Sequence, residues 1–274
     1  MTLQGKGVTT ADSYAETRKA FDAAAPAYDA AYEHLPGIRR IRSITRRIYL
    51  ENFTPGSRIL ELNCGTGNDA VFLAQQGMHV LATDISPGMM AQAEKKLPLA
   101  GATKGSVRLK VMPFEGIPDL SGEVFDGACS NFGGLNCTER LEEVSRDLAE
   151  LIRPAGTFIA TVMPPFCLWE TAAFLARLRW KQAFRRMSRG GIVADLHGGH
   201  VRTYYFGPGA FRRAFSEHFD HVRTLGLAIL MPPPNFTRLG GLTDFMGRVD
   251  DIVGRIPLVR AIGDHYTIVL RRKG

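Results

Sequence analysis

A short apolar run that stops at two glycines constrains the fold of this chain more than any other stretch. Residues 58–62 have the apolar character of a buried β-strand. Gly65 and Gly67 follow, and glycine lets the backbone turn tightly and approach a ligand without a Cβ atom in the way. Asn68 and Asp69 can then cap a helix. A strand, a glycine turn and a helix N-terminus together predict a cofactor-binding loop at the carboxyl end of a parallel sheet.

The glycine pattern alone is compatible with two kinds of cofactor. The two glycines and Ala70 also satisfy the dinucleotide-binding pattern, with Asp84 at the distance expected of a ribose-binding acid. A nicotinamide-dependent oxidoreductase is therefore one alternative. Glu61 and Asn63, however, place a carboxylate and an amide where a dinucleotide-binding strand is normally apolar. These two side chains suit a ligand with a cationic amino-acid end better than they suit a pyrophosphate.

The same turn carries a resemblance to a known family. Residues 61–67, Glu-Leu-Asn-Cys-Gly-Thr-Gly, closely resemble the first motif of class I S-adenosylmethionine-dependent methyltransferases. Asn63 departs from that motif, because a glycine is more usual at its position. The resemblance implies that S-adenosylmethionine is the cofactor, that S-adenosylhomocysteine is its product, and that Glu61 and the glycine turn hold the methionine end.

Two later segments resemble the same family in the expected order. Residues 83–89 resemble its second motif, which implies that Asp84 grips the ribose while Ile85 packs on the adenine. Residues 113–118 resemble the segment at the adenine edge, with Pro113 where an aspartate is usual. The residues after the fourth strand occupy the position where this family holds the transferring methyl group. The expected cofactor-binding residues are Glu61, Asn63, Gly65, Thr66, Gly67, Asp84, Ile85, Met89, Phe114, Glu115, Asn131 and Phe132.

The N-terminal segment predicts helices over 11–33, interrupted at Pro26, and over 38–53. Residues 21–29 resemble the N-terminal lid of the ubiquinone/menaquinone-type small-molecule methyltransferases. In that group a tyrosine at the position of Tyr28 lies near cofactor and substrate. The alternative is a tyrosine that only packs in the core.

Residues 166–207 form an insertion that predicts a helical cap with an apolar face. Its basic residues are either solvated or form a surface for an anionic membrane or a lipid-like substrate. Two histidines in a glycine-rich turn are candidate bases, and no third ligand with metal-binding spacing accompanies them. The basic residues of the insertion are Arg177, Arg179, Lys181, Arg185, Arg186 and Arg189. The candidate catalytic residues are His197, His200 and Tyr28. The candidate substrate contacts are Tyr28, Trp169 and Tyr205.

The fold that we predict is one α/β domain with a Rossmann-like, seven-stranded, mostly parallel sheet and helices on both faces. A long connection between the last two strands, near 221–230 and 265–271, fits an antiparallel pair at the sheet edge. We expect four parts, namely an N-terminal helical lid (1–53), a cofactor-binding core (54–163), a helical substrate cap after strand five (164–207) and the remainder of the sheet (208–274).

Composition limits the class of protein but not its substrate. Apolar residues make up 45% of the chain, no apolar run is long enough to cross a bilayer, and the N-terminus lacks the apolar centre of a signal peptide. Four scattered cysteines predict reduced, cytoplasmic usage and no metal site. The charge of +7 leaves an anionic membrane surface or an acidic substrate open as partners.

The resulting prediction is methyl transfer from S-adenosylmethionine to a small, apolar, lipid- or quinone-like acceptor. A nucleic-acid methyltransferase or binding module is the alternative from another class, and it would show affinity that falls steeply with salt. Residues 163–166, Met-Pro-Pro-Phe, lack the leading amide or acid of the DNA amino-methylating motif and follow the fifth strand instead of the fourth. We therefore expect a small-molecule acceptor and no nucleic acid.

Overall fold

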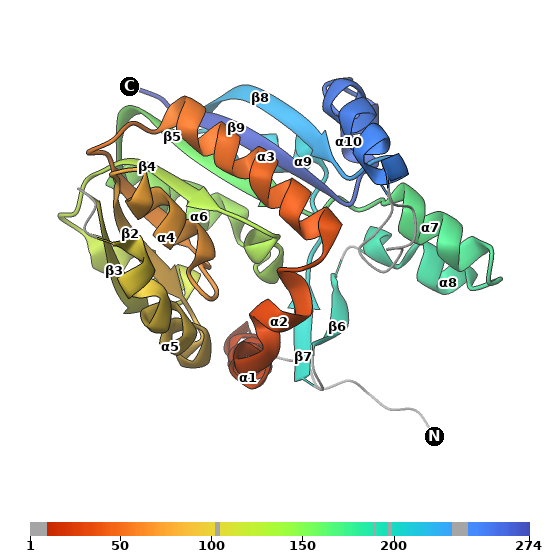
Figure 1. The fold of residues 1–274 in the computed structure, drawn as a ribbon, viewed down its shortest axis with the longest axis horizontal. Coiled ribbons are helices and arrows are strands. Elements are labelled where there is room, and N and C mark those ends of the chain that lie inside the picture. The colour runs from red at the N-terminus through yellow and green to blue at the C-terminus, as the bar shows by residue number, and fades with distance from the viewer. Residues whose placement is uncertain (1–9, 102–104, 189, 197–198, 232–240) are drawn as a thin grey trace.

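The computed structural model describes residues 10–101, 105–188, 190–196, 199–231 and 241–274. Its centre is a seven-stranded sheet in the order β3-β2-β1-β4-β5-β9-β8 (Figure 1). β9 runs antiparallel to both of its neighbours, whereas the strands from β3 to β5 pair in parallel. The predicted sheet is thereby confirmed. The strands are β1 (Arg58–Leu62), β2 (His79–Asp84), β3 (Ser106–Val111), β4 (Phe125–Ser130), β5 (Ile152–Val162), β8 (Phe219–Leu227) and β9 (His265–Arg272).

Helices cover both faces of the sheet because alternate strand residues point to opposite sides. In β1, Ile59 belongs to the core beneath α3 (Pro36–Asn52) and α4 (Asn68–Gln75). Leu60 and Leu62 belong to the core beneath α6 (Leu141–Leu151) and α9 (Pro208–Phe215). The two cores hold the carboxyl ends of β1 and β4 rigidly at one edge.

The turn after β2 begins the next helix with a capping serine and a proline. Ser86 is the N-cap of α5 (Pro87–Lys96), and its hydroxyl accepts the N–H of Met89 at 3.0 Å. Pro87 occupies the first helical position, where no hydrogen-bonded N–H is needed.

The N-terminal lid consists of α1 (Thr10–Ala24) and α2 (Tyr28–Tyr32), joined by a 3₁₀ turn at Ala25–Ala27 that contains Pro26. The predicted interruption at Pro26 is confirmed. Figure 1 shows the lid below the carboxyl edge of the sheet, beside the strands β6 and β7 of the insert. The lid therefore covers the edge where the glycine turn lies.

The insert is only partly helical. α7 (Leu168–Leu175) and α8 (Trp180–Ala183) confirm the predicted helical half. β6 (Ile192–Leu196) and β7 (Gly199–Thr203) then form a separate two-stranded hairpin, which the helical prediction missed. Alternate residues of β6 differ in exposure, which is the period-two pattern of a strand. A strand this short carries too few residues for that pattern to be recognised in the sequence.

The chain closes with α10 (Gly241–Val253) packed near β8 and with β9 inserted between β5 and β8. Within the described ranges, no helix is both long and apolar enough to cross a membrane.

Candidate functional site

A cavity of about 380 Å³ lies at the carboxyl edge of the parallel strands. The sheet contributes the residues that follow β1, β2 and β4, and the lid and the β6–β7 hairpin contribute the opposite walls. Ten of the twelve predicted cofactor residues line it, namely Glu61, Asn63, Gly65, Thr66, Asp84, Ile85, Met89, Phe114, Asn131 and Phe132.

The two glycines of the turn have different structural roles. Gly65 has φ +55°, and an added Cβ would meet no atom within 4 Å, because it would enter the open cavity. Gly67 has φ +75°, and its Cβ would lie 2.8 Å from Cβ of Ala93. Gly65 therefore keeps ligand space free, whereas Gly67 allows α4 to pack closely against α5, and it does not line the cavity.

Asp84 holds the turn in place from the end of β2. One carboxylate oxygen accepts the N–H of Gly65 at 2.9 Å, and the other accepts the N–H of Ser86 at 2.9 Å. Burial raises the pKa of Asp84 to about 6, although these N–H donors oppose that rise. Each oxygen still has a second acceptor position. The predicted contact with ribose stays a prediction, and the structure adds a role in shaping the loop.

Asn63 ties the ends of β1 and β4 together. Its φ of +47° lies in the left-handed region, which asparagine tolerates better than most residues. Its amide donates to the carbonyl oxygen of Asn131 at 3.1 Å and accepts the hydroxyl of Ser130 at 2.6 Å. An added Cβ at Gly134 would lie only 1.9 Å from this amide. The departure from the usual glycine at position 63 is therefore matched by a glycine at 134.

Glu61 faces the cavity with an unsatisfied carboxylate. The residue is 2% exposed, and its Oε2 atom has no hydrogen-bond partner among the described residues. Burial and the nearby Asp69 raise the pKa of Glu61 well above its ordinary value, and Arg42 and Arg46 only partly oppose this. An enclosed carboxyl group without a partner is costly, and a cationic ligand group would relieve that cost.

A charged network lies directly behind Glu61. Asp69 accepts Arg42 at 3.0 Å, Arg46 at 2.8 Å and the amide of Asn131 at 2.7 Å. Burial raises the pKa of Asp69, but the two arginines outweigh burial and hold it below its ordinary value. Arg42 also pairs with Glu33 of the lid, so that α3, α4 and the loop after β4 are joined beneath the cavity floor.

Two further aspartates fasten the lid onto the cofactor loops. Asp22 of α1 accepts the Ser86 hydroxyl at 2.6 Å and the N–H of Gly88 at 2.8 Å. Asp29 of α2 accepts the hydroxyl of Thr66 at 2.6 Å and pairs with Lys96 at 2.5 Å. The lid therefore contacts both the glycine turn and the N-terminus of α5 while the cavity remains between them.

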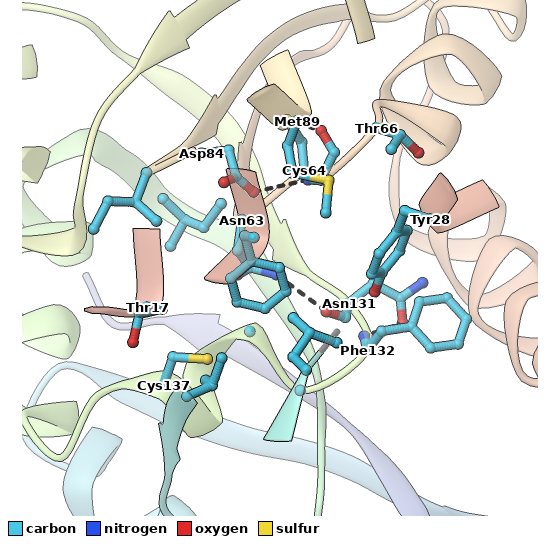
Figure 2. Close-up of a pocket in the computed structure, with 18 of the residues that line it drawn as sticks. Thr17, Tyr28, Asn63, Cys64, Thr66, Asp84, Met89, Asn131, Phe132 and Cys137 are labelled. Carbon is cyan, nitrogen blue, oxygen red and sulfur yellow. Dashed lines mark hydrogen bonds between the residues drawn. The ribbon is translucent and has the colours of Figure 1, made fainter. Parts of the chain in front are cut away.

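Tyr28 is the predicted substrate contact that lines the cavity. Figure 2 shows its ring directed from the lid toward Asn131 and Phe132. Trp169 and Tyr205, the other two predicted substrate contacts, do not line the cavity, and their contact with substrate stays a prediction. The indole N–H of Trp169 donates to the carbonyl of Leu230 at 3.0 Å, and the ring of Tyr205 lies beneath a guanidinium group of the insert.

Other predicted positions fall away from the cavity as well. His200 is exposed on β7 and does not line it, and His197 lies outside the described residues, as does Arg189. Glu115 is exposed and lies next to Tyr14 instead of facing the cavity. The first turn of 3₁₀ helix after β3 directs only Phe114 inward.

Arg186 is buried, so it is an exception to the prediction that the basic residues of the insert are solvated or form a surface for an anionic membrane or substrate. It is 9% exposed and pairs with Glu170 at 2.7 Å and with Asp264 at 2.8 Å. Arg185 pairs with Glu170 at 2.8 Å. Arg186 thus anchors the insert helices to the start of β9, while Arg177 remains exposed.

Several cavity residues were not identified from the sequence. They are separated in the chain and meet only through the fold. Arg42 lies 4.6 Å above the ring of Phe132, and Thr17 brings a buried hydroxyl without a partner. His265 enters because β9 is antiparallel, so that its first residue lies at the same edge as the last residue of β5.

Two cysteines line the cavity, but neither has the character of a nucleophile. Burial raises the pKa of Cys137 to about 12 and that of Cys64 well above its ordinary value. Both therefore stay protonated near neutral pH. Among the described residues, no group of three His, Cys, Asp or Glu side chains is placed to hold a metal ion.

The residues present fit S-adenosylmethionine. The partnerless carboxyl of Glu61 suits a cationic amino-acid end, and the space in front of Gly65 suits a close backbone approach. Ile85, Met89 and Phe114 supply apolar walls on the side of Asp84, where a flat base would lie.

Comparisons with known proteins place the core in one family. Residues 59–156 match a family described as "Methyltransferase domain". The chain is 31% identical over 103 residues to the S-adenosyl-L-methionine-dependent Diels-Alderase iccD of Talaromyces variabilis. This match covers 38% of this chain and 35% of that protein. It is 30% identical over 119 residues to the demethylmenaquinone methyltransferase of Beutenbergia cavernae, with 42% and 45% covered. The matches thus span less than half the length of these curated relatives.

A solved structure extends the likeness in fold to almost the whole chain. The magnesium protoporphyrin IX methyltransferase ChlM of Synechocystis, solved with bound S-adenosylhomocysteine (SAH), superposes with a TM-score of 0.59 at 17% identity. The match covers 96% of this chain and 100% of that structure. At this identity the likeness concerns the fold alone.

Proposed function

We propose that the protein is a class I S-adenosylmethionine-dependent methyltransferase that transfers a methyl group to a small, largely apolar acceptor, and the match of residues 59–156 to a methyltransferase domain supports this. The observation that carries the proposal is the enclosed carboxyl of Glu61, which faces the cavity without a partner in front of the glycine turn. A cationic cofactor supplies the missing partner. The nicotinamide alternative offers no such cation at this position.

The chain binds and orients the cofactor with groups that are already in place. Glu61 and the open space in front of the glycine turn hold the amino-acid end, and Asp84 accepts from the ribose with its free acceptor positions. S-adenosylmethionine supplies an electrophilic methyl group on a sulfonium sulfur. The protein then has to align the acceptor in a dry pocket, and such alignment contributes about 7–11 kcal/mol in favourable cases.

The other half of the cavity supports an apolar, ring-containing acceptor. Aromatic side chains from the lid and from the loop after β4 form its walls, including Tyr28, Tyr32 and Phe132. Leu196 and Val201 of the hairpin complete it. A similar protein is named a demethylmenaquinone methyltransferase, which supports a quinone-like or other lipid-like acceptor for this chain too.

The tip of the insert supports peripheral contact with an anionic lipid surface. Leu178 is 78% exposed and Trp180 is 61% exposed. Arg177, Arg179 and Lys181 are exposed around them. Exposed apolar residues among cations are typical of membrane-surface binding. Binding to vesicles with and without phosphatidylserine, compared with the Arg177→Glu/Arg179→Glu variant, tests this contact.

Calorimetry and radiolabelled methyl transfer test the main proposal together. We expect binding of S-adenosylmethionine and SAH but not of NAD⁺ or NADP⁺. We expect methyl incorporation into at least one member of a library of quinols, phenols and lipid extracts. Tight nicotinamide binding, or no binding of S-adenosylmethionine, would contradict the proposal.

A second candidate function is a cyclisation in which the cofactor binds without being consumed. It is supported by the similarity to a Diels-Alderase and by the mainly apolar acceptor half of the cavity. Formation of SAH separates the two reactions. Methyl transfer releases one SAH for each product molecule, whereas a cyclisation releases none.

A further inference from the structure

His265 lies at the wall of the cavity, in contact with Asp264. β9 begins at His265, beside Leu227 of β8 and one residue before the pairing of Tyr266 with Val162 of β5. Since β9 runs antiparallel to β5, its first residue lies at the carboxyl edge of the parallel strands. His265 is 7% exposed, and among the described residues that line the cavity it is the only histidine.

The pairing leaves one ring nitrogen for a ligand. Nδ1 of His265 is fully enclosed and lies 3.0 Å from Oδ2 of Asp264, although this contact lacks the angle of a hydrogen bond in the structure. Nε2 is therefore the nitrogen that can meet a molecule in the cavity. Asp264 is fixed in turn by Arg186, whose Nη2 lies 2.8 Å from its Oδ1. Burial raises the pKa of Asp264, but His265 and Arg186 outweigh burial and hold it below its ordinary value, so the carboxylate stays charged.

The ring lies next to the residue expected at the transferring methyl group. The edge of His265 faces Phe132, with ring centroids 6.3 Å apart. Phe132 follows β4, and the guanidinium of Arg42 covers its ring at 4.6 Å. The charged groups around His265 are thus Asp264 and Arg186 on one side, and Arg42, which is paired with Asp69 and Glu33, on the far side of Phe132.

Tyr28 and the two thiols that line the cavity are poor bases. Burial raises the pKa of Tyr28, so its hydroxyl stays protonated near neutral pH. The two cavity thiols, Cys64 and Cys137, are protonated for the same reason. An imidazole beside a buried carboxylate is suited to accept a proton.

We infer that His265 is the general base that removes a proton from a hydroxyl group of the acceptor, and that Asp264 is its positioning residue. The inference rests on the proposed methyltransferase function. As the acceptor oxygen takes the methyl carbon, its proton passes to Nε2, and the carbon–sulfur bond breaks with its electron pair left on sulfur. The acceptor class is accordingly an apolar molecule with an acidic hydroxyl, such as a phenol or a hydroquinone.

The kinetic test uses the full chain with 1-naphthol and 1,4-naphthohydroquinone as probe acceptors. We expect His265→Gln to lower kcat by about 10²- to 10⁴-fold without changing the affinity for SAH. The wild-type rate should rise with pH through the titration of one imidazole, and that step should vanish in the variant. Added imidazole should restore part of the rate of His265→Ala, and Asp264→Asn should lower kcat more than it changes KM.

A matched control is His79→Gln, because His79 is exposed at the opposite edge of the sheet and its imidazole pairs with the hydroxyl of Ser106. It should leave both the rate and the pH profile unchanged. If the wild type methylates a probe and His265→Gln does so equally well, the inference is wrong and the proposed function stands. If the wild type binds no S-adenosylmethionine, the proposed function fails, and this inference fails with it.

A second readout needs no turnover. Nitrogen NMR of the unliganded protein should show His265 with its proton on Nδ1, and 1-naphthol should shift the Nε2 resonance in the presence of SAH. A ring that carries its proton on Nε2 and does not respond to 1-naphthol would overturn the inference, even where neither probe is methylated.

Discussion

Replacing Glu61 with glutamine should weaken cofactor binding while leaving the cavity almost unchanged in shape. The substitution keeps the size of the side chain and removes only its charge. In the structure Oε2 of Glu61 is buried without a partner, so its contribution to folding is unfavourable and its contribution to binding a cation is favourable. Glu61→Gln should therefore raise the stability of the unliganded protein and lower its affinity for S-adenosylmethionine.

The expected loss follows from the strength of charged hydrogen bonds. A hydrogen bond to a charged group contributes about 1.5–3 kcal/mol. At about 1.4 kcal/mol for each factor of ten, Glu61→Gln should weaken binding by about 10- to 100-fold. Asp69 cannot compensate, because Arg42, Arg46 and Asn131 already occupy its oxygens.

The pH dependence that Glu61 gives to the stability and to the cofactor affinity of the wild type has a definite sign. The pKa of Glu61 is raised in the folded state above that of the unfolded chain. Its favourable contribution to stability is thus complete below the ordinary glutamate pKa of 4.5 and is lost as pH rises toward the folded value. Cation binding favours the ionised form, so affinity should rise with pH and binding should release protons. Both effects should disappear in Glu61→Gln.

Isothermal titration with S-adenosylmethionine at about pH 6 and about pH 8, in buffers of different ionisation enthalpy, measures the affinity and the proton count. Glu123→Gln is a matched control, because Glu123 pairs with Arg58 and Arg108 far from the cavity. Urea unfolding of the unliganded proteins measures the change in stability. Unchanged affinity in Glu61→Gln, with no proton released by the wild type, would refute the assigned role of this carboxyl group.

Three further substitutions test other parts of the site. Gly65→Val should abolish cofactor binding, while its far-ultraviolet circular dichroism should stay like that of the wild type. Gly56→Val, at φ +87° with equally free space around it, is the control and should bind the cofactor normally. Normal binding by both variants would contradict the placement of the cofactor. Asp84→Ala should weaken cofactor binding at least about tenfold by calorimetry, because the ribose contact and the hydrogen bond from the Gly65 N–H are both lost. An unchanged affinity would show that Asp84 does not bind the cofactor. Arg186→Gln should lower the free energy of unfolding by about 3–5 kcal/mol in urea, against little change for Arg177→Gln, and equal stability of the two variants would show that the buried pairs are not needed.

The cofactor half of the site could be predicted from the sequence because its geometry is local. A strand, a glycine turn and a helix N-terminus are each specified within a few residues. The predicted cap by Asn68 or Asp69 is wrong, because the N-cap of α4 is Gly67 and makes no side-chain hydrogen bond. The apolar residues Ile59, Leu60 and Leu62 likewise predicted a buried strand, and in the structure they pack on the two faces of β1.

The acceptor half could not be predicted because contacts distant in sequence build it. The docking of the lid depends on Asp22 meeting the turn before α5, and nothing near Asp22 in the sequence indicates that partner. Arg186 resembled its exposed neighbours until the fold brought Glu170 and Asp264 to it. The position of His265 depends on the direction of β9, which local periodicity does not determine.

The two candidate reactions depend on different side chains of the same cavity, so substitutions at those side chains can separate them. Both need the cofactor to bind, so both depend on the carboxyl of Glu61. Methyl transfer to a hydroxyl group also needs a proton acceptor, which His265 provides beside Phe132. A cyclisation between carbon atoms moves no proton and would use His265 only as part of the wall. Loss of activity in both Glu61→Gln and His265→Gln therefore favours methyl transfer, whereas loss in Glu61→Gln alone favours a cyclisation in which the bound cofactor shapes the cavity.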